Sequence, residues 1–336
     1  MLEGQSTIDQ IYTVYSGKFR RYHGESWLKR ILDIKTNGLN IRDAALVVVG
    51  FFQSLRLLTG IKPDVILLKG GFVGVPVGLA AALTKRSFIT HDSDIIPGLA
   101  NRLVGRWASL HATGMPAEHY KYPRDSVRHV GVLVVEDYQH VTPQLQKQYK
   151  IDLGLSPASR VLLVTGGSLG ARAINLAMVK ISPELLQKYS DLHIIHQVGK
   201  GNVRTYGEYT HHRLKVLEFL NPLATYMGAS DIVVTRAGAN TMAELGVQGK
   251  ASVVIPNPLL TGGHQLKNAE YLLQQKAIAV VDETNISKDP QVLLTQLETL
   301  LQDSGQRQKL ADNLHSLTIT DAAQRLALLL LETASK

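Results

Sequence analysis

Short apolar runs alternate with helix-like segments along almost the whole chain. Ten runs rich in β-branched and aliphatic residues predict strands, at residues 65–68, 87–90, 110–113, 127–130, 161–164, 193–197, 214–219, 232–235, 252–255 and 277–281. The segments between these runs are long enough to be crossover helices. This alternation favours an α/β protein built on doubly wound parallel sheets.

Two helices are predicted outside this alternation. Residues 47–58 form an apolar segment that carries a single charge, Arg56. Near the end of the chain, residues 321–333 place Leu326, Leu329 and Leu330 on one face of a helix. That helix is long enough to cross back onto the first domain.

The length of 336 residues suggests two domains. Residues 131–160 predict the linker, because they hold Gly131, a polar stretch and the run Leu-Gly-Leu-Ser-Pro at 153–157. We therefore expect an N-terminal domain at 1–135 and a C-terminal domain at 136–318, with residues 319–336 packing back on the first. The N-terminal domain looks incomplete, because no Gly-rich turn follows the short run 11–14, where such a domain normally opens.

Composition narrows the classes of function. The chain has no cysteine, which excludes disulfides, thiolate zinc sites and cysteine nucleophiles. A net charge of +8 suits an anionic membrane surface or a polyphosphate ligand, or simply a basic soluble protein. The interleaved aromatic residues of a base-stacking surface are missing, so we expect no nucleic acid partner. The longest apolar run is 44–52, short of the about 20 residues that span a bilayer, which predicts a soluble or peripheral cytoplasmic protein.

The segment 16–58 mixes basic and apolar residues. Its basic side chains alternate with aromatic and aliphatic ones, and they are Lys18, Arg20, Arg21, Lys29, Arg30 and Lys35. A surface of this kind can lie on anionic lipid. It is equally explained as a solvated charged face over a core helix.

A Gly-rich turn, Thr165 to Arg172 (TGGSLGAR), follows one predicted strand and opens a helix. Its glycines permit tight turning, and its exposed N–H groups suit phosphate. Alone, the turn fits NAD, a flavin, a sugar nucleotide or plain helix–strand packing. The turn Gly70-Gly71 in the first domain is a weaker signal, which close packing explains as well.

The stretch 231–269 carries more specific chemistry. Strand 232–235 runs into the sequence Arg-Ala-Gly-Ala-Asn-Thr, and a helix bearing Glu244 follows. A second strand leads to Gly263-His264-Gln265 and then Asn268. Diphosphate prefers the bare N–H groups of a helix N-terminus, ribose hydroxyls a carboxylate, and sugar hydroxyls amides. In a dinucleotide-binding dehydrogenase, the acidic residue that binds the ribose follows the next strand, whereas Glu244 lies on the helix itself. The stretch therefore predicts a nucleotide-sugar site.

The sequence His91-Asp92-Ser93-Asp94 follows another predicted strand. Carboxylates beside an imidazole at the end of a strand suit acid–base chemistry. The alternatives are that Asp94 caps a helix and that His91 is structural. We find no second histidine at metal-ligand spacing, so no metal is expected.

Several ordered motifs together resemble the bacterial MurG family of N-acetylglucosaminyltransferases. They are SGKFRRY, KPDVILLKGGFVGVP, HDSDIIPGLANRL, VTGGSLGARAIN, EFLNPLATYMGASDIVVTRAGANTMAEL, GGHQLKNA and DAAQRL, and they extend over essentially the whole chain. The resemblance implies the GT-B fold, two Rossmann-like domains facing a cleft. It implies inverting transfer of N-acetylglucosamine from UDP-N-acetylglucosamine to the 4-hydroxyl of the muramyl sugar of lipid I, at the cytoplasmic face of the membrane and without a cofactor.

The resemblance also assigns residues. The glycines and Ser168 would face the diphosphate, Leu220 and Leu223 the uracil, and Glu244 the ribose, while Gln265 with His264 and Asn268 would read the sugar. The implied donor residues are Gly166, Gly167, Ser168, Leu169, Gly170, Leu220, Leu223, Ala239, Asn240, Thr241, Met242, Ala243, Glu244, His264, Gln265 and Asn268. The implied acceptor residues are Gly70, Gly71, Phe72, Asp94 and Asn101, and the candidate catalytic residues are Asp92 and His91.

Two features depart from the family pattern. The family opens with a strand and a Gly-Gly-Thr-Gly-Gly-His loop that carries its proposed catalytic histidine, and this sequence lacks both. The hinge motif Gly-Asn-Pro-Val-Arg is replaced by residues 131–135, which end in Val135. Three other functions therefore stay open: a glycolipid synthase, a UDP-N-acetylglucosamine 2-epimerase, and a non-catalytic donor-binding subunit that needs a partner chain.

Overall fold

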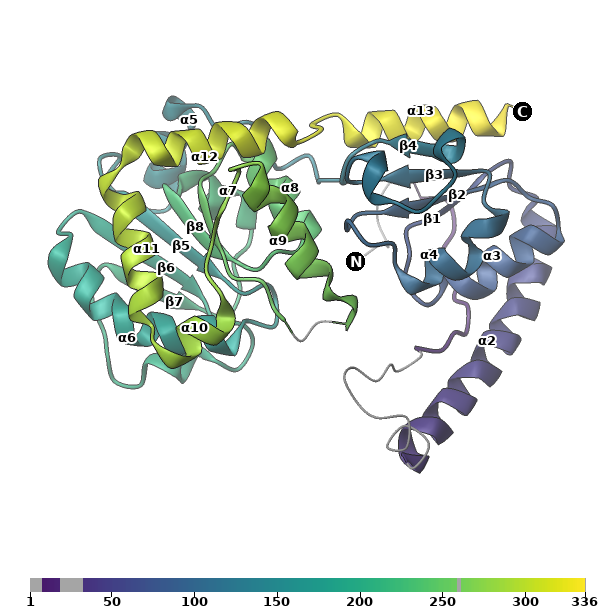
Figure 1. Cartoon of the computed structure of the whole chain (residues 1–336), viewed down its shortest axis with the longest axis horizontal. Coiled ribbons are helices and arrows are strands. Elements are labelled where there is room, and N and C mark those ends of the chain that lie inside the picture. Colours follow the sequence, from purple (N-terminus) through teal and green to yellow (C-terminus); the bar gives the residue numbers. More distant parts are fainter. Residues whose placement is uncertain (1–7, 19–32, 259–260, 336) are drawn as a thin grey trace. The chain divides into compact units, whose positions relative to one another are not determined.

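The computed structural model describes residues 8–18, 33–258 and 261–335. The chain divides into two compact α/β units (Figure 1). Unit 1 consists of residues up to Asp92, residues 96–130 and residues 324–336, and unit 2 of residues 93–95 and 131–323. The predicted basic positions Arg20, Arg21, Lys29 and Arg30 lie outside the described residues.

Unit 1 contains a four-stranded parallel sheet in the order β1-β2-β3-β4. Its strands are β1 (Ile66–Leu68), β2 (Phe88–Asp92), β3 (Leu110–Thr113) and β4 (Val127–His129). Its helices are α2 (Ile34–Ile61), α3 (Gly74–Leu83), α4 (Leu99–Val104), most of α13 (Ala322–Ala334), and the short η1 (Gly105–Trp107), η2 (Ala117–His119) and η3 (Arg124–Ser126). Each described strand lies next to its neighbour in sequence, so these four strands form no point where the strand order reverses. Residues 11–14 are not a strand.

Helix α2 is more than twice as long as the predicted 47–58. Asp33 caps it by accepting a hydrogen bond from the Thr36 N–H at 3.0 Å, and it ends at Lys62 in the left-handed conformation. Its length and composition alone would let it cross a membrane, and most of that stretch is not buried. The expectation that no segment is apolar over such a length was therefore wrong. The polar residues near its start concealed the helix, because they interrupt the apolar run without ending the helix.

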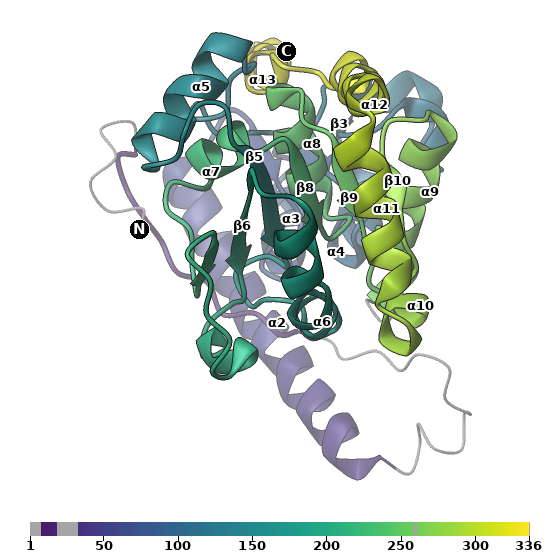
Figure 2. The same cartoon turned by 90° about the vertical axis from the view of Figure 1, so that its left-hand side faces the viewer.

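Unit 2 contains a six-stranded parallel sheet in the order β10-β9-β8-β5-β6-β7. Figure 2 shows the labelled strands from β10 to β6 in this order. Its strands are β5 (Arg160–Thr165), β6 (Leu192–Gln197), β7 (Leu214–Leu217), β8 (Ile232–Thr235), β9 (Ser252–Val254) and β10 (Ala279–Val280). Its helices are α5 (Pro143–Asp152), α6 (Arg172–Lys188), α7 (Leu223–Ala229), α8 (Ala239–Gln248), α9 (His264–Gln274), α10 (Glu283–Lys288), α11 (Gln291–Gln302), α12 (Ser304–Leu317), and the short η4 (Val203–Tyr206) and η5 (Thr261–Gly263). The predicted strand 214–219 ends at Leu217, and the two residues after it, Glu218 and Phe219, are exposed.

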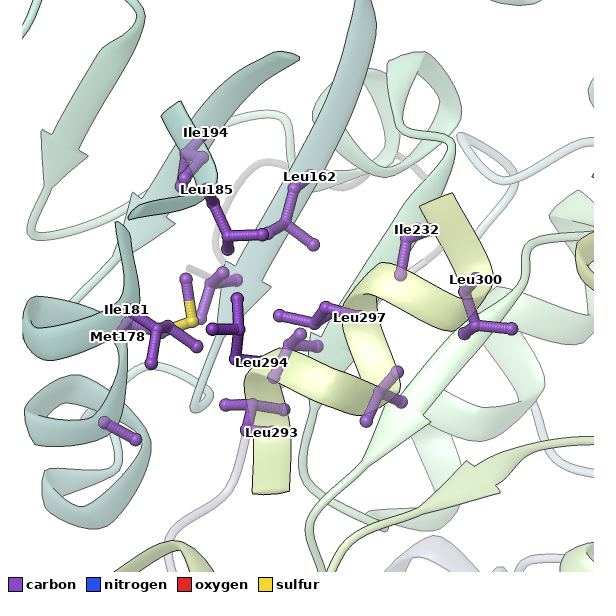
Figure 3. Packing of buried hydrophobic residues seen from close by; sticks show 14 of the residues in the cluster. Leu162, Met178, Ile181, Leu185, Ile194, Ile232, Leu293, Leu294, Leu297 and Leu300 are labelled. Atoms are coloured by element: carbon purple, nitrogen blue, oxygen red, sulfur yellow. The ribbon is translucent and has the colours of Figure 1, made fainter. Parts of the chain in front are cut away.

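Alternate residues of the central strands face two separate cores. Leu162 and Val164 of β5 pack with α6, α10 and α11, where Met178, Ile181 and Leu297 meet (Figure 3). Val161 and Leu163 of the same strand pack with α7, α8, α9 and α12 on the other face. A parallel sheet buried on both faces explains why its strands are continuous apolar runs.

Two buried lysines hold the start of β8 in place. Lys150 Nζ donates to Ser159 O at 2.7 Å and lies 3.0 Å from Asp231 Oδ2. Lys250 Nζ donates to Gly228 O at 2.6 Å and to Ser230 O at 3.2 Å. Burial lowers the pKa of Lys250 to about 7, although Asp231 acts in the opposite direction.

This low pKa makes unfolding depend on pH. Between about pH 7 and the ordinary lysine value, the unfolded chain binds a proton at Lys250 that the folded chain has lost. The free energy of unfolding should therefore rise with pH over that range. We expect Lys250→Met to remove this slope, on the order of 2 kcal/mol between pH 7 and 9. Urea unfolding of both proteins at the two pH values tests it, and equal pH slopes would contradict it.

Candidate functional site

The strand order of unit 2 reverses at β5. From β5 the chain goes to β6 on one side, whereas β8, β9 and β10 lie on the other side. In open α/β sheets, ligands bind beyond the carboxyl ends of the strands at such a point. Thr165 at the end of β5 pairs in register with Thr235 at the end of β8. The Gly-rich turn and the turn that opens α8 therefore leave the sheet side by side.

The Gly-rich turn needs its glycines for two distinct reasons. Gly167 has φ +84°, and a Cβ there would meet nothing within 4 Å, so the backbone is open on that side. At Gly170, with φ +74°, a Cβ would lie 2.0 Å from Val198 O. Ser168 and Leu169 between them are exposed. No side chain caps the following helix, α6. Within the turn, the Gly167 N–H donates to Thr165 Oγ1 at 3.2 Å and the Gly170 N–H to Gly167 O at 2.9 Å, so the backbone left for a ligand is that of the exposed Ser168 and Leu169 and of the first turn of α6.

Helix α8 begins at the second turn. Its N-cap is Gly238, which has no side-chain capping hydrogen bond, and Asn240 is exposed in the first turn. Glu244 lies further along the same helix and is mostly buried. Burial raises the pKa of Glu244, and a hydrogen bond from Tyr138 lowers it. A helix N-terminus followed by a carboxylate is the predicted arrangement for a diphosphate and a ribose.

Helix α9 carries the residues predicted to read the sugar, and these side chains differ in how far they are exposed and already hydrogen-bonded. Gln265 Oε1 accepts from the Asn257 N–H at 2.9 Å, an arrangement that orients its amide. Asn268 is 0% exposed, and its amide donates to Asp94 Oδ1 and Ala237 O and accepts from the Ile95 N–H. The side chain of Asn268 is thus used inside unit 2, which the sequence did not indicate.

Several predicted donor residues contribute packing. Leu220 is 2% exposed and lies with Met242 in the core beneath α8, where Leu223 packs at the edge. Ala239 and Ala243 are buried against Val132. These side chains shape the site from below, and their contact with a nucleotide stays a prediction.

One residue that the sequence analysis missed, Arg236, holds the site in place. Arg236 donates to Ile255 O at 3.0 Å and pairs with Glu283, which ties the turn before α8 to the end of β9 and to α10. Spacing did not indicate this arginine, because its partners are distant in sequence.

In unit 1, the turn Gly70-Gly71 follows β1 and opens toward α3. Both glycines have positive φ, +81° and +77°, and a Cβ on Gly71 would meet nothing within 4 Å. Asn101 lies beside Gly70 and is 1% exposed. Its Nδ2 donates to His91 O and to Asp92 Oδ1, whereas its Oδ1 has no partner among the described residues. Phe72 is exposed next to this turn.

Asp92 is the centre of a buried network at the end of β2. Oδ1 accepts from the Gly98 N–H at 3.0 Å and from Asn101 Nδ2 at 2.9 Å, and Oδ2 accepts from the Tyr122 hydroxyl at 2.9 Å. The Tyr122 ring stacks on His111 with centroids 3.6 Å apart. Three donors of the chain thus anchor this carboxylate, and burial with Asp92 raises the pKa of Tyr122. A catalytic role for Asp92, or for the buried His91 beside it, stays a prediction.

Asp94 clusters with unit 2 rather than with the other predicted acceptor residues. Its Oδ2 lies 3.9 Å from His264 Nδ1, and its Oδ1 accepts from Asn268 Nδ2 at 2.8 Å. The alternative that Asp94 caps a helix was wrong, because α4 begins after Gly98. The structure therefore joins Asp94 to two residues that the resemblance assigned to the donor.

Comparisons with known proteins identify the family. Residues 161–326 match the glycosyltransferase family 28 C-terminal domain, and residues 29–112 match the glycosyltransferase family 28 N-terminal domain. A protein of Geotalea uraniireducens is 35% identical over 288 residues, which cover 84% of this chain and 77% of the relative. That relative is named UDP-N-acetylglucosamine--N-acetylmuramyl-(pentapeptide) pyrophosphoryl-undecaprenol N-acetylglucosamine transferase. The chain belongs to the MurG family.

Solved structures support the fold of a MurG family member. Acinetobacter baumannii MurG superposes with a TM-score of 0.67 at 24% identity, over 86% of this chain and 79% of that one. A UDP-GlcNAc 2-epimerase from Neisseria meningitidis bound to UDP-GlcNAc gives 0.59 at 17% identity, over 85% and 81%. The predicted fold class, GT-B with two Rossmann-like parallel-sheet units, is confirmed, and the chain is a glycosyltransferase of the MurG family.

Proposed function

We propose that this chain transfers N-acetylglucosamine from UDP-N-acetylglucosamine to the 4-hydroxyl of the muramyl sugar of lipid I, and so forms lipid II. Membership of the MurG family supports this function, since its relatives are named for that donor and that acceptor. The observation that carries it is the pair of uncapped turns side by side at the reversal point of the unit 2 sheet, followed by Glu244.

The donor is held by backbone and by a few side chains. The N–H groups of the Gly-rich turn and of the first turn of α8 bind the diphosphate, whose charge the positive helix ends favour. Glu244 accepts from the ribose hydroxyls, and Gln265, fixed through Asn257, reads hydroxyls of the sugar. UDP-N-acetylglucosamine carries a ribose, a diphosphate and a sugar, the three parts that these protein groups suit.

The reaction is a single displacement with inversion. A bond forms between the acceptor 4-oxygen and the anomeric carbon as the bond from that carbon to the UDP β-phosphate oxygen breaks. The electron pair of the broken bond stays on UDP, and the hydroxyl proton passes to a base. Because the same helix ends that bind the diphosphate stabilise its growing charge, they accelerate departure of UDP. Asp92 and His91 stay the candidates for acid–base work.

We assign the acceptor to unit 1. The open backbone of Gly70 and Gly71 suits a close approach by a diphosphate or sugar. Asn101 Oδ1, buried and without a partner in the described part of the chain, suits an acceptor hydroxyl or amide donor. Phe72 offers an exposed apolar ring beside them.

The undecaprenyl chain of such an acceptor lies in a bilayer, and unit 1 has a surface suited to one. An apolar hollow of about 570 Å³ is lined by Val47, Val48, Phe51 and Phe52 of α2, Leu79, Ala82 and Leu83 of α3, and Trp107. The guanidinium of Arg106 lies 3.9 Å from the centre of the Trp107 ring. Exposed apolar side chains beside a cation fit the interface of an anionic membrane. We propose that this surface binds peripherally to the cytoplasmic face of the cell membrane.

Phe52→Asp tests this membrane surface. Phe52 is exposed at the hollow, and a charge there should weaken binding to phosphatidylglycerol-containing vesicles about tenfold, since burying one such side chain contributes about 1.5–3 kcal/mol. Phe219→Asp, at an equally exposed phenylalanine of unit 2, is the matched control. Vesicle sedimentation measures both. Equal binding of the two variants would contradict the assignment.

The function itself is tested with the whole chain, labelled UDP-N-acetylglucosamine and lipid I in detergent micelles. The expected result is labelled lipid II together with one UDP per sugar transferred. Formation of UDP-N-acetylmannosamine without an acceptor would indicate an epimerase, and transfer to diacylglycerol, supplied in place of lipid I, would indicate a glycolipid synthase. UDP-sugar binding with no product would indicate a non-catalytic subunit. Each of these three outcomes overturns the proposal.

A further inference from the structure

The last residues of β5 and β6 form a hydrogen-bonded pair immediately before the Gly-rich turn. Thr165 and Gln197 are Cα partners in the parallel register, and each residue is only 2% exposed. Thr165 Oγ1 donates to Gln197 Oε1 at 2.9 Å. Partner residues of neighbouring parallel strands point to the same face of the sheet, so this contact follows from the register of the two strands.

The pair reaches the turn through the threonine hydroxyl. The Gly167 N–H donates to Thr165 Oγ1 at 3.2 Å. A hydroxyl has one proton and two lone pairs, and the carbonyl oxygen of a glutamine side chain can only accept. Because Gln197 takes the hydroxyl proton, a lone pair of Thr165 Oγ1 is left for Gly167. We call these two hydrogen bonds, from Thr165 to Gln197 and from Gly167 to Thr165, the relay.

The other end of the turn is held by packing against the residue that follows β6. A Cβ on Gly170 would lie 2.0 Å from Val198 O, and that carbonyl accepts from Asn175 Nδ2 at 2.9 Å. Asn175 is itself buried, and its Oδ1 lies 3.1 Å from His196 Nε2. The end of β6 therefore fixes the turn twice, through the relay at Gly167 and through close packing at Gly170.

We propose that Thr165 and Gln197 are positioning residues for the donor diphosphate: the Thr165 hydroxyl, oriented by Gln197, fixes the start of the turn and thereby the N–H groups of the exposed residues 168–169. The inference rests on the proposed donor site. Donors that are held in place before the ligand arrives bind it more tightly, because less ordering is needed on binding. Without the relay, the diphosphate itself has to order the turn.

The experiment compares UDP with uridine, which carries the base and the ribose but no phosphate. Both are titrated calorimetrically against the whole chain, uridine by its displacement of UDP. Thr165→Val keeps the shape of the side chain and removes the hydroxyl, so that Gly167 loses its acceptor. We expect UDP binding to weaken about fivefold, the scale of one hydrogen bond, while uridine binding stays unchanged.

Two further variants test the relay as a unit. Gln197→Met removes the acceptor and lets the threonine hydroxyl turn away from its present direction, so it should weaken UDP binding about threefold. Added to Thr165→Val, it should cause no further loss, because both changes act through the same hydroxyl. Thr165→Ser retains the hydroxyl and should bind UDP like the wild type.

Thr113→Val is the matched control. Thr113 is also a buried threonine at the end of a parallel strand, but in unit 1, and its hydroxyl donates to Met115 O at 2.9 Å. The control should leave the binding of both ligands unchanged. Circular dichroism checks that each variant is folded, and if Thr165→Val fails to fold, the UDP and uridine affinities of Gln197→Met decide instead.

Three results would overturn the role of the relay: equal weakening of UDP and uridine, additive effects in the double variant, or a serine variant as weak as the valine one. A wild type that fails to bind UDP would overturn the donor site and this inference together. A folded Thr165→Val protein with normal UDP binding would overturn the inference alone.

Discussion

Replacing Glu244 by alanine is expected to raise the KM for UDP-N-acetylglucosamine about a hundredfold. Each hydrogen bond between a ribose hydroxyl and a charged carboxylate contributes about 1.5–3 kcal/mol, and each 1.4 kcal/mol is a factor of about ten. The ribose is remote from the breaking bond, so its contacts are similar in the ground state and the transition state. The turnover number should therefore change much less than KM. Steady-state transfer to lipid I at varied donor concentration measures both.

Glu270→Ala is the matched control, because Glu270 is an exposed carboxylate of α9 that pairs with Lys267 on the surface. It should leave KM for the donor unchanged. If Glu244→Ala kept a normal KM, or lost turnover with KM intact, the ribose would not be the partner of this carboxylate.

Replacing Asp231 by alanine should lower the free energy of unfolding of unit 2 by about 3–5 kcal/mol, the range found when one partner of a buried ion pair is removed. Its carboxylate faces Lys150 Nζ at 3.0 Å and accepts from the Val161 N–H at 2.8 Å and from Gln146 Nε2 at 3.1 Å. Lys150 is buried, so the variant leaves a cation without its counter-charge. Thermal and urea unfolding followed by circular dichroism would show the loss.

A second substitution distinguishes charge from packing. Asp231→Asn combined with Lys150→Met removes both charges but keeps an acceptor for the Val161 N–H, and it should recover much of the stability. Lys267→Ala, on the surface, should change little. If Asp231→Ala unfolded like the wild type, the buried cluster would contribute nothing to unit 2.

Local pattern predicted the strands of unit 2 well. The runs at 161–164, 193–197 and 232–235 match β5, β6 and β8 within one residue at each end, because a parallel sheet covered on both faces requires continuous apolar strands. The sequence also predicted the tight turn after β5 from its glycines. Gly170 has positive φ and lies against the backbone of Val198, and only glycine fits both conditions.

Contacts between distant residues could not be predicted in this way. The sugar-reading role expected of Asn268 stays a prediction, and nothing in the sequence indicated that its amide bonds to Asp94 and Ile95, more than 170 positions away. The length of helix α2 was underestimated for a different reason. Asn37, Gly38 and Asn40 are poor helix formers, but Asp33 caps the helix, and its C-terminal half packs in the core of unit 1.

The two glycines Gly170 and Gly199 constrain how this enzyme can be altered. A Cβ on Gly170 would lie 2.0 Å from Val198 O, and one on Gly199 would lie 2.4 Å from the Gly170 nitrogen, so each excludes a side chain on the other. Neither position can compensate for a change at its neighbour, and a library aimed at new nucleotide donors should leave both invariant. Leu169 lies between these contacts at 85% exposure and is free to vary. Substitutions at Leu169 would test whether this expected donor contact affects the choice of nucleotide, and none of them would meet these clashes.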